Sequence, residues 1–321
     1  MTPEISVLIP CYDRMALLER TLLACFEQRV AESIGWEILV CDNHPDELAR
    51  PLVEALRGRA AVPLRHIPAP ARNIARARNA GLAATQARYI AFVDDDEAPE
   101  PGWLQNYFDC LERTGADAAF GPKYPVFATG APPAWDPEAA HYTTDFRLPR
   151  DTPIGRVGQW GRVLGAGNSF MRAATCLQGL TPFNEVLGRV DGEDTELYFR
   201  LLKAGRRFVW CPDAVVREVM QQSRLDFAYM RERLERGSRT SARCRISASD
   251  HRGATHLMLM AVGAAQVLLH GALFALTGEF RTPSRVRHRL GIARGLGKLT
   301  YRSGQVAFIV EAPSSPAATR R

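Results

Sequence analysis

The sequence predicts an α/β protein followed by a basic, apolar, helical tail, and three observations support this fold class. In the first hundred residues, short runs rich in β-forming residues alternate with stretches of helical periodicity, which is typical of βαβ units and a parallel sheet. Beyond residue 221 the pattern changes to helices alone. The charge divides at the same point: residues 1–220 carry 24 Lys and Arg against 29 Asp and Glu, a balance of −5, whereas residues 221–321 carry 17 against 6, a balance of +11.

The expected elements follow in chain order. Four apolar runs of strand length lie at 4–10, 36–42, 63–67 and 88–94. Helical stretches lie between them, near 14–29, 46–58 and 72–86. Residues 120–160 are rich in Pro, Gly and aromatic residues, and we interpret them as a long functional loop. After this loop the pattern predicts a strand at 162–171, a helix at 195–204 and a strand at 207–211.

The 321 residues are enough for about two domains. We divide the chain into an α/β domain at 1–220, a helical region at 221–310, and a Pro-, Ser- and Ala-rich tail at 311–321 that is predicted to be disordered. The seven cysteines form no C-x-x-C pair and no short metal spacing, which indicates reduced thiols and argues against a zinc finger. No basic segment precedes the short apolar run at the N-terminus, so a signal peptide is not expected.

The strongest chemical signal is an acidic cluster at the end of the fourth predicted strand. Asp94, Asp95, Asp96 and Glu97 follow the apolar run at 90–93. Adjacent carboxylates repel one another unless a positive group neutralises them, and a divalent cation can do this while it shares its shell with substrate phosphates. Doubly wound sheets bind ligands beyond the carboxyl ends of their strands. The cluster therefore favours a metal and phosphate site over a solvated acidic turn that caps a helix.

Three weaker patterns accompany the cluster. Residues 71–81 (ARNIARARNAG) bring arginines and asparagines to the start of a helix, where they either bind an anion or form a solvated face. Glu193 and Asp194 begin an amphipathic stretch, as catalytic carboxylates or as ordinary helix caps. Residues 165–168 (GAGN) form a loop whose backbone can approach a ligand closely. No G-x-G-x-x-G follows a strand, and no P-loop pattern is present.

Together these motifs resemble inverting family 2 glycosyltransferases with the GT-A fold, over roughly residues 4–220. The motifs occur in the family's order: ISVLIPCYDR at 5–14, Cys41-Asp42-Asn43, Asn73 with Arg78-Asn79 and Gly81, the D-x-D motif of Asp94–Asp96, and Gly192-Glu193-Asp194. The resemblance implies a Rossmann-like mixed sheet, a nucleotide-diphosphate-sugar donor, most simply a UDP-sugar, and Mg²⁺ or Mn²⁺ as cofactor. It is nearest to bacterial enzymes that build exopolysaccharide repeat units and other lipid-linked glycans.

The resemblance also implies which residues bind the donor. Asp42 would contact the base, whereas Asn73 and Arg78 would help to hold the base and the diphosphate. Asp94 would touch the ribose or the diphosphate. The complete set of expected donor-binding residues is Pro10, Tyr12, Asp13, Asp42, Asn73, Arg78, Asp94 and Asp95.

For the chemistry itself, the resemblance implies a metal ligand and a general base. Asp96, expected as a surface carboxylate at a strand end, would ligate the metal. Many relatives carry a histidine after the strand at 214–218, and Glu218 is the candidate substitute here. Asp194 would accept the proton of the acceptor hydroxyl with Glu193 beside it, although from the sequence alone either carboxylate could be the base. A bound cation would stabilise the departing diphosphate, and direct displacement would invert the anomeric carbon.

The predicted function is therefore metal-dependent transfer of one sugar, of the hexosyltransferase class, to a saccharide or lipid-linked acceptor in cell-surface glycan or exopolysaccharide biosynthesis. Residues 221–224 (QQSR) match part of the acceptor motif of processive relatives, but Leu225 replaces their tryptophan, so we expect non-processive transfer. Three alternatives remain open. A sugar-1-phosphate nucleotidyltransferase would open with a Gly-rich loop, a nucleic-acid-binding protein would use the basic tail, and a degenerate binding module would not turn over.

The tail contains an apolar run, residues 257–276, that is long enough to span a bilayer. On a helix, its few polar or small positions share one narrow stripe: His256, Gly263, Gln266, His270 and Thr277. Basic residues flank both ends, so a single crossing would translocate one basic flank. We therefore expect a cytoplasmic enzyme, peripheral or monotopic on the inner face of the cytoplasmic membrane, without a nucleic-acid partner. The soluble alternative is a helix packed on the catalytic domain.

Overall fold

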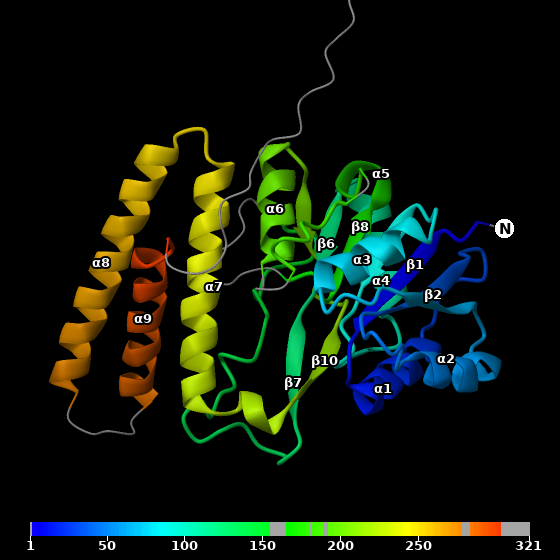
Figure 1. The fold of residues 1–321 in the computed structure, drawn as a ribbon, viewed down its shortest axis with the longest axis horizontal. Coiled ribbons are helices and arrows are strands. Elements are labelled where there is room, and N and C mark those ends of the chain that lie inside the picture. Colours follow the sequence, from blue (N-terminus) through cyan, green and yellow to red (C-terminus); the bar gives the residue numbers. More distant parts are fainter. Residues whose placement is uncertain (1, 155–164, 180, 189–191, 278–282, 303–321) are drawn as a thin grey trace, which may run out of the picture.

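The structure is a computed structural model that describes residues 2–154, 165–179, 181–188, 192–277 and 283–302. A layered α/β part lies beside a layer of three long helices, which the C-terminal third of the chain forms (Figure 1). The last strand ends at Met220, so the architecture changes where the charge and the periodicity of the sequence change.

The α/β part is built on a seven-stranded sheet with the order β3-β2-β1-β4-β8-β6-β9. Its strands are β1 (Ile5–Cys11), β2 (Trp36–Asp42), β3 (Leu64–Pro68), β4 (Tyr89–Phe92), β6 (Ala118–Phe120), β8 (Ser169–Arg172) and β9 (Phe208–Trp210). Only β8 is antiparallel to its neighbours, β4 and β6. The sheet is therefore mixed, as the resemblance implied, and its four predicted N-terminal strands are confirmed.

Helices cover both faces of this sheet, because alternate residues of a buried strand point to opposite faces. Ile5, Val7 and Ile9 of β1 pack with α1, α2 and α4 on one face, whereas Leu8 and Leu39 pack with α3 and α6 on the other. The helices of this part are α1 (Met15–Phe26), α2 (Arg50–Leu56), η1 (Arg57–Arg59), α3 (Ile74–Ala83), α4 (Trp103–Thr114), α5 (Ala173–Cys176) and α6 (Glu193–Lys203).

A small second sheet stands next to the large one, in the order β5-β10-β7. Its strands are β5 (Glu97–Pro99), β7 (Lys123–Phe127) and β10 (Val216–Met220). The segment 120–160, which we interpreted as a loop, therefore begins with a strand. Pro125 lies within β7, where it is tolerated because β7 is an edge strand. The predicted strand at 162–171 falls partly on residues 155–164, which lie outside the described residues, and β8 begins only at Ser169.

The helical layer contains α7 (Phe227–Ala248), α8 (Arg252–Leu276) and α9 (Pro283–Leu299), and the short helix η2 (Gln222–Arg224) leads into it. Helix α9 lies between α7 and α8 and packs against both, whereas α7 packs against α6 of the α/β part (Figure 1). Residues 303–321, which include the tail predicted to be disordered, lie outside the described residues. All seven cysteines are free and buried, in agreement with the expectation of reduced thiols.

Candidate active site

Three strand ends meet at one edge of the large sheet and carry most of the predicted site residues. Strands β1, β2 and β4 are parallel neighbours, so their carboxyl ends open on the same side. Pro10 is buried within β1, whereas Tyr12 is half-buried and Asp13 is exposed just beyond it. Asp42 is the last residue of β2, and the acidic cluster begins at Asp94, shortly after β4. The fold thus brings together residues that are far apart in the sequence.

Side chains of the protein itself neutralise the acidic cluster. Asp95 is 1% exposed and forms an ion pair with Arg14. Asp96 is 5% exposed, so it is not the surface carboxylate that we expected; it pairs with Arg14 and lies 3.2 Å from Nη1 of Arg224. The same Nη1 atom lies 3.5 Å from Oε1 of Glu218. The two predicted metal ligands, Asp96 and Glu218, therefore converge on one cationic group.

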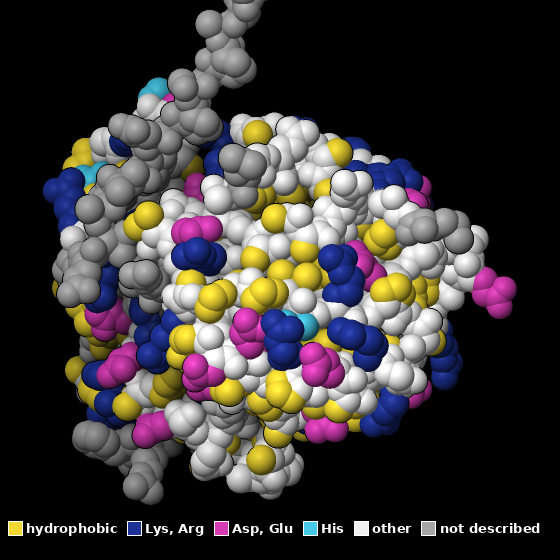
Figure 2. Space-filling model, turned by 45° about the vertical axis from the view of Figure 1, so that its right-hand side comes forward, with side chains coloured by type: hydrophobic (Ala, Val, Ile, Leu, Met, Phe, Trp, Pro, Cys, Tyr) yellow, Lys and Arg dark blue, Asp and Glu magenta, His cyan; other side chains and the backbone are white. Residues whose placement is uncertain are grey.

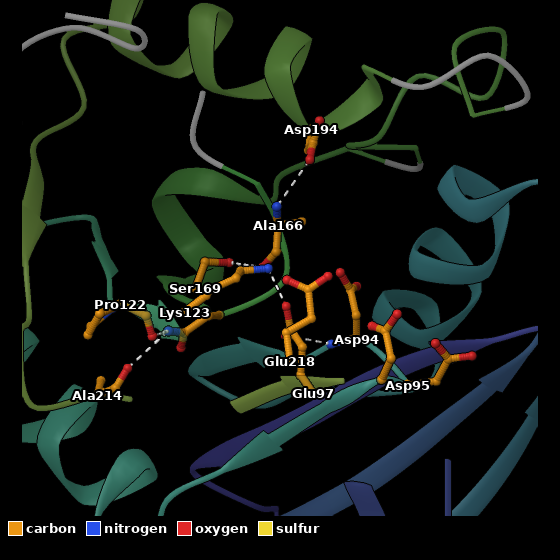
Figure 3. A network of polar contacts seen from close by, with 12 residues as sticks. Asp94, Asp95, Glu97, Pro122, Lys123, Ala166, Ser169, Asp194, Ala214 and Glu218 are labelled. Carbon is orange, nitrogen blue, oxygen red and sulfur yellow. Dashed lines mark hydrogen bonds and ion pairs between the residues drawn. The ribbon is translucent and has the colours of Figure 1, made fainter. Parts of the chain in front are cut away.

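Lys123 supplies a further buried cation from the small sheet. Its ammonium group forms an ion pair with Glu97, which also accepts a hydrogen bond of 3.0 Å from the backbone N–H of Asp94. Figure 3 shows these side chains gathered beside the loop that carries Ala166. A Cβ on Gly167 would lie 2.4 Å from Oδ2 of Asp94 and 2.7 Å from Nζ of Lys123. The loop at 165–168, predicted to allow close approach, therefore closes over the acidic cluster.

Arg78 joins the acidic cluster to the start of α6. The guanidinium is buried, with Nη2 3.1 Å from Oδ1 of Asp94 and Nη1 2.5 Å from Oε1 of Glu193. It reaches both partners because α3, on which it lies, turns its buried face toward the sheet and α6. A buried cation needs such partners, since an unpaired charge in the interior is strongly destabilising. The predicted contact of Arg78 with the diphosphate stays a prediction.

Helix α6 begins with two carboxylates that have different surroundings. Glu193 is 3% exposed, pairs with Arg78 and accepts a hydrogen bond of 3.1 Å from the backbone N–H of Gly192. Asp194 is only partly buried, and its Oδ2 accepts a hydrogen bond of 3.1 Å from the backbone N–H of Ala166. Figure 3 shows Asp194 pointing from α6 toward that loop. Glu193 thus acts as an internal counter-ion, whereas Asp194 remains accessible from outside.

Burial shifts the proton affinity of the site. It raises the pKa of Asp95 to about 7, that of Glu97 to about 8 and that of Glu193 to about 7, and the partner cation of each only partly offsets this effect. Burial acts in the same direction on Asp94, but nearby cations, led by Arg78, outweigh it and lower the pKa of that carboxyl. The cluster therefore contains both an ionised carboxylate and others that hold protons near neutral pH. Such divergent pKa values are typical of functional sites.

The residues expected at the base form a second group, beyond β1 and β2. Asp42 is fully buried, and its carboxylate accepts hydrogen bonds from the backbone N–H groups of His44, at 3.0 Å, and Ala49, at 2.8 Å. Nε2 of His66 lies 3.1 Å from the same carboxylate. Asp42 therefore shapes the turn that follows β2, and its contact with a base stays a prediction.

An aromatic and cationic surface lies next to this turn. The rings of Tyr12 and His44 have centroids 4.9 Å apart, and the guanidinium of Arg72 lies 5.4 Å from the Tyr12 centroid. Asn73 caps α3, because its side chain accepts a hydrogen bond of 3.2 Å from the backbone N–H of Arg76. Arg72 therefore lies just before α3, although we expected a helical stretch from about residue 72. Flat rings beside a cation are suited to stacking against another ring.

Two carboxylates of the site carry oxygen atoms of the kind that a divalent cation prefers. Within the described ranges, no group of three or more His, Cys, Asp or Glu side chains is gathered closely enough to hold a metal ion. Asp96 and Glu218 nevertheless present the oxygen ligands that Mg²⁺ and Mn²⁺ prefer, and they converge on the Arg224 guanidinium, where a positive charge already lies. A cation that exchanged with this group would therefore meet both carboxylates.

Sequence reasoning missed the cations of the site: Arg14, Lys123 and Arg224. Arg14 is the last residue of the motif at 5–14, so its position next to Asp13 could have identified it. Lys123 lies in the segment that we interpreted as a loop, 26 residues from its partner Glu97. Arg224 lies 128 residues from its partner Asp96. No local pattern marks such partners, because the fold alone brings them together.

Comparisons with known proteins agree with this architecture. Succinoglycan biosynthesis protein ExoM of Rhizobium meliloti is 29% identical over 242 residues, which are 75% of each chain. Staphylococcus aureus TarS 1–349 in complex with UDP-GlcNAc has a TM-score of 0.57 and 15% identity, over 94% of this chain and 92% of that one. The mannosyltransferase PcManGT from Pyrobaculum calidifontis, in complex with GDP-Man and Mn²⁺, has a TM-score of 0.60 and 16% identity, over 94% and 88%.

At such identities the two solved structures establish the fold, which is of the GT-A type. The family is established by the sequence. The model of glycosyl transferase family 2 matches residues 6–173, which is more than half of the chain and includes the acidic cluster. The match ends at Ala173, directly after β8, the strand that follows the loop over that cluster. The chain is therefore a glycosyltransferase and belongs to glycosyltransferase family 2.

Proposed function

We propose that this enzyme transfers one sugar from a nucleotide-diphosphate sugar to a saccharide or lipid-linked acceptor, with inversion at the anomeric carbon. The observation that carries the proposal is the arrangement around Arg78. This residue ties the acidic cluster at Asp94 to the carboxylates that begin α6 at Glu193. A donor phosphate side and an acceptor side with an accessible carboxylate, Asp194, thus belong to one site.

The similar proteins support the substrate class. ExoM is a protein of succinoglycan biosynthesis, so we propose a role in exopolysaccharide or another cell-surface glycan. TarS binds UDP-GlcNAc and PcManGT binds GDP-Man, which supports a nucleotide-sugar donor. We take a UDP-sugar as the first donor to test. Tyr12, His44 and Arg72 would lie against the base, which is a flat ring.

The proposed mechanism assigns a distinct task to each group. Asp194 accepts the proton of the acceptor hydroxyl, and that oxygen attacks the anomeric carbon as the bond to the diphosphate breaks. Glu193 stays with Arg78 and fixes the start of α6. Asp96 and Glu218 would hold Mg²⁺ or Mn²⁺, which supplies positive charge to the leaving diphosphate.

We also propose that the transfer takes place on the inner face of the cytoplasmic membrane, where lipid-linked acceptors are available. The support is helix α8, which is long and apolar enough to cross a membrane by length and composition. Figure 2 shows that Lys and Arg are interspersed with Asp and Glu on the face that it presents. That face offers no basic surface to a nucleic acid.

A donor screen tests the proposed function. The full-length enzyme is incubated with UDP- and GDP-sugars and with Mg²⁺ or Mn²⁺, and release of the nucleoside diphosphate is measured. Asp96→Asn should abolish the cation-dependent part, whereas Asp109→Asn, an exposed aspartate of α4, should leave it intact. Pyrophosphate formation from a sugar 1-phosphate and a nucleoside triphosphate would instead support a nucleotidyltransferase. Donor binding without any turnover would support a binding module.

A further inference from the structure

Helix α8 has two faces of different character. From Leu257 to the end of the helix, its exposed positions recur with helical spacing and are all apolar: Leu257, Met258, Ala261, Val262, Ala265, Leu268, Leu269, Ala272, Leu273, Ala275 and Leu276. We refer to this set as the α8 outer face. Leu268 is 73% exposed and Leu276 is 81% exposed. Such a continuous apolar face is uncommon on a protein surface that stays in water.

The opposite, polar stripe of α8 is satisfied by its neighbours. Gln266 accepts a hydrogen bond of 3.0 Å from Lys298 of α9. Nδ1 of His270 lies 3.1 Å from Nδ1 of His288, which is also on α9. At Gly263 the helices touch so closely that a Cβ would lie 3.0 Å from a backbone oxygen of α9. Helices α8 and α9 therefore form one unit, and the stripe predicted from the sequence is its internal seam.

Helix α9 cannot follow α8 through a bilayer, because it is strongly basic. It contains no Asp or Glu and five basic residues: Arg285, Arg287, Arg289, Arg294 and Lys298. Each of them would be costly at the centre of the hydrocarbon layer. Its other side packs against α7, which also carries many charges. A crossing by α8 would thus require the whole layer to separate.

Cations also stand at both ends of the α8 outer face. At the beginning, the Tyr301 hydroxyl lies 2.9 Å from Nδ1 of His256, and Nε of Arg302 lies 3.0 Å from the same hydroxyl. At the other end, the guanidinium of Arg285 lies 4.1 Å from the centroid of Phe274. A helix that lies flat on an anionic surface brings both ends into contact with it, whereas a crossing helix brings only one.

We infer that the α8 outer face docks into an anionic lipid surface, with α8 parallel to the membrane plane and α9 at the level of the headgroups. From Leu257 to Leu276 the helix is about 29 Å long, so length alone would also allow a crossing. The basic partner helix decides against it. This inference rests on the membrane location proposed above but not on catalysis. A second copy of the chain is a less favourable partner for this face than a lipid surface. Pairing two such faces would bring the cations at their ends close to one another.

Vesicle binding tests the surface. The full-length protein is sedimented with vesicles of phosphatidylcholine that contain phosphatidylglycerol, and with phosphatidylcholine alone. The double variant Leu268→Glu, Leu269→Glu should bind the anionic vesicles about a hundredfold more weakly, because each leucine contributes roughly tenfold. The matched control, Leu48→Glu with Val186→Glu, changes two exposed aliphatic residues of the α/β part and should bind normally. An equal loss of vesicle binding in both double variants would overturn the inference. So would a dimer that forms without lipid and that Leu268→Glu, Leu269→Glu converts to monomers while the control variant does not.

Depth measurements test the orientation. All seven natural cysteines are buried, so single cysteines introduced as Leu257→Cys, Leu268→Cys and Leu276→Cys can be labelled selectively with a fluorophore. Quenching by lipids that carry a quencher at known depths should place the three probes at a similar, shallow depth. An impermeant thiol reagent outside sealed vesicles should reach all three unlabelled cysteines. A deep probe at position 268, with one end protected, would show a crossing helix. Neither readout requires turnover, so a failed transferase assay leaves this test intact.

Discussion

The acidic site and the helices α8 and α9 differ in how their charged residues are arranged. In the site, each buried carboxylate has a cation from a distant segment: Asp95 with Arg14, Glu97 with Lys123, and Glu193 with Arg78. Helices α8 and α9 contain no acidic residue, and the guanidinium of Arg289 packs over the ring of Phe227. Charges that are paired inside the chain hold the shape of a site, whereas a segment with an excess of positive charge attracts an external anion.

One chain can thus assign catalysis and membrane binding to different regions, the acidic site and the helical layer. In the site, Arg14, Lys123 and Arg78 are already paired with carboxylates of the chain. Helices α8 and α9 instead carry a net positive charge, with exposed arginines at 252 and 287. Each of the following experiments perturbs one side of this comparison and leaves the other unchanged, beginning with the largest expected effect.

Removing the proposed base should have the largest effect. Asp194→Asn keeps the size of the side chain but cannot accept a proton, so transfer should fall by about 10²–10⁴-fold while donor affinity changes little. Initial rates and donor titrations on the purified enzyme measure both quantities. Vesicle binding should be unchanged, because Asp194 lies on α6, and α7 and α9 stand between α6 and α8 (Figure 1).

Glu193→Gln is the matched variant at the neighbouring carboxylate. It should lower stability more than Asp194→Asn does, because Glu193 is a buried partner of Arg78. If Asp194→Asn retains full transfer while a folded Glu193→Gln loses it, the roles of the two carboxylates are exchanged. Full activity in both variants would contradict the proposed mechanism.

The loop over the acidic cluster should be the next most sensitive position. A Cβ at Gly167 would collide with Asp94 and Lys123, so Gly167→Ala should cost about 1–3 kcal/mol of unfolding free energy and weaken donor binding. Gly165→Ala is the control, since its Cβ would meet Asp194 at an ordinary 3.7 Å. Chemical denaturation and donor titration compare the two. Equal unfolding free energies of the two variants would show that the loop can move to accept the added methyl group without loss of stability.

Neutralising exposed arginines should affect the helical layer alone. Arg252, which begins α8, and Arg287 of α9 are both exposed. Each contributes about 1 kcal/mol at an anionic surface, so Arg252→Gln with Arg287→Gln should weaken binding to anionic vesicles roughly tenfold or more. Binding to neutral vesicles and donor turnover should not change. A loss that is the same for both vesicle types would mean that the arginines act through the fold.

The pH dependence of stability should show a smaller effect, confined to the acidic site. The raised pKa values of Asp95, about 7, and Glu97, about 8, mean that the folded chain holds protons that the unfolded chain releases from about pH 4 upward. Stability should therefore fall as the pH rises from about 5 to about 8. Thermal denaturation should follow this as a shift of several degrees, since about 1 kcal/mol moves the midpoint by roughly 2–4 °C.

Glu97→Gln should flatten that pH profile, because a group that does not titrate contributes no slope. Mg²⁺ or Mn²⁺ should raise the melting temperature more at the upper end of the range than at the lower end, since the ion binds the deprotonated carboxylates. A profile that rises with pH in the unmodified protein would contradict the pKa directions. An unchanged slope in Glu97→Gln would assign the effect to other groups.

Much of the α/β part could be predicted from the sequence, because its signals are local. Runs of apolar residues such as 88–94 encode a buried strand, and the acidic residues after it mark the carboxyl edge of the sheet. The polar stripe of α8 was predictable for the same reason, since helical spacing is a local property. Strand β7 was not, because its pairing with β10 joins positions such as Lys123 and Val216 that no short pattern connects.

The sequence by itself determined the family, the mixed α/β fold, the acidic cluster and the amphipathic character of α8, all of which depend on neighbours along the chain. The tertiary structure decided which of two adjacent carboxylates is internal, because only packing separates the buried Glu193 from the accessible Asp194. It also supplied the cations of the site, and it turned the polar stripe of α8 toward α9. Ion pairs and helix seams join residues that are distant in sequence, so only the folded chain can specify them.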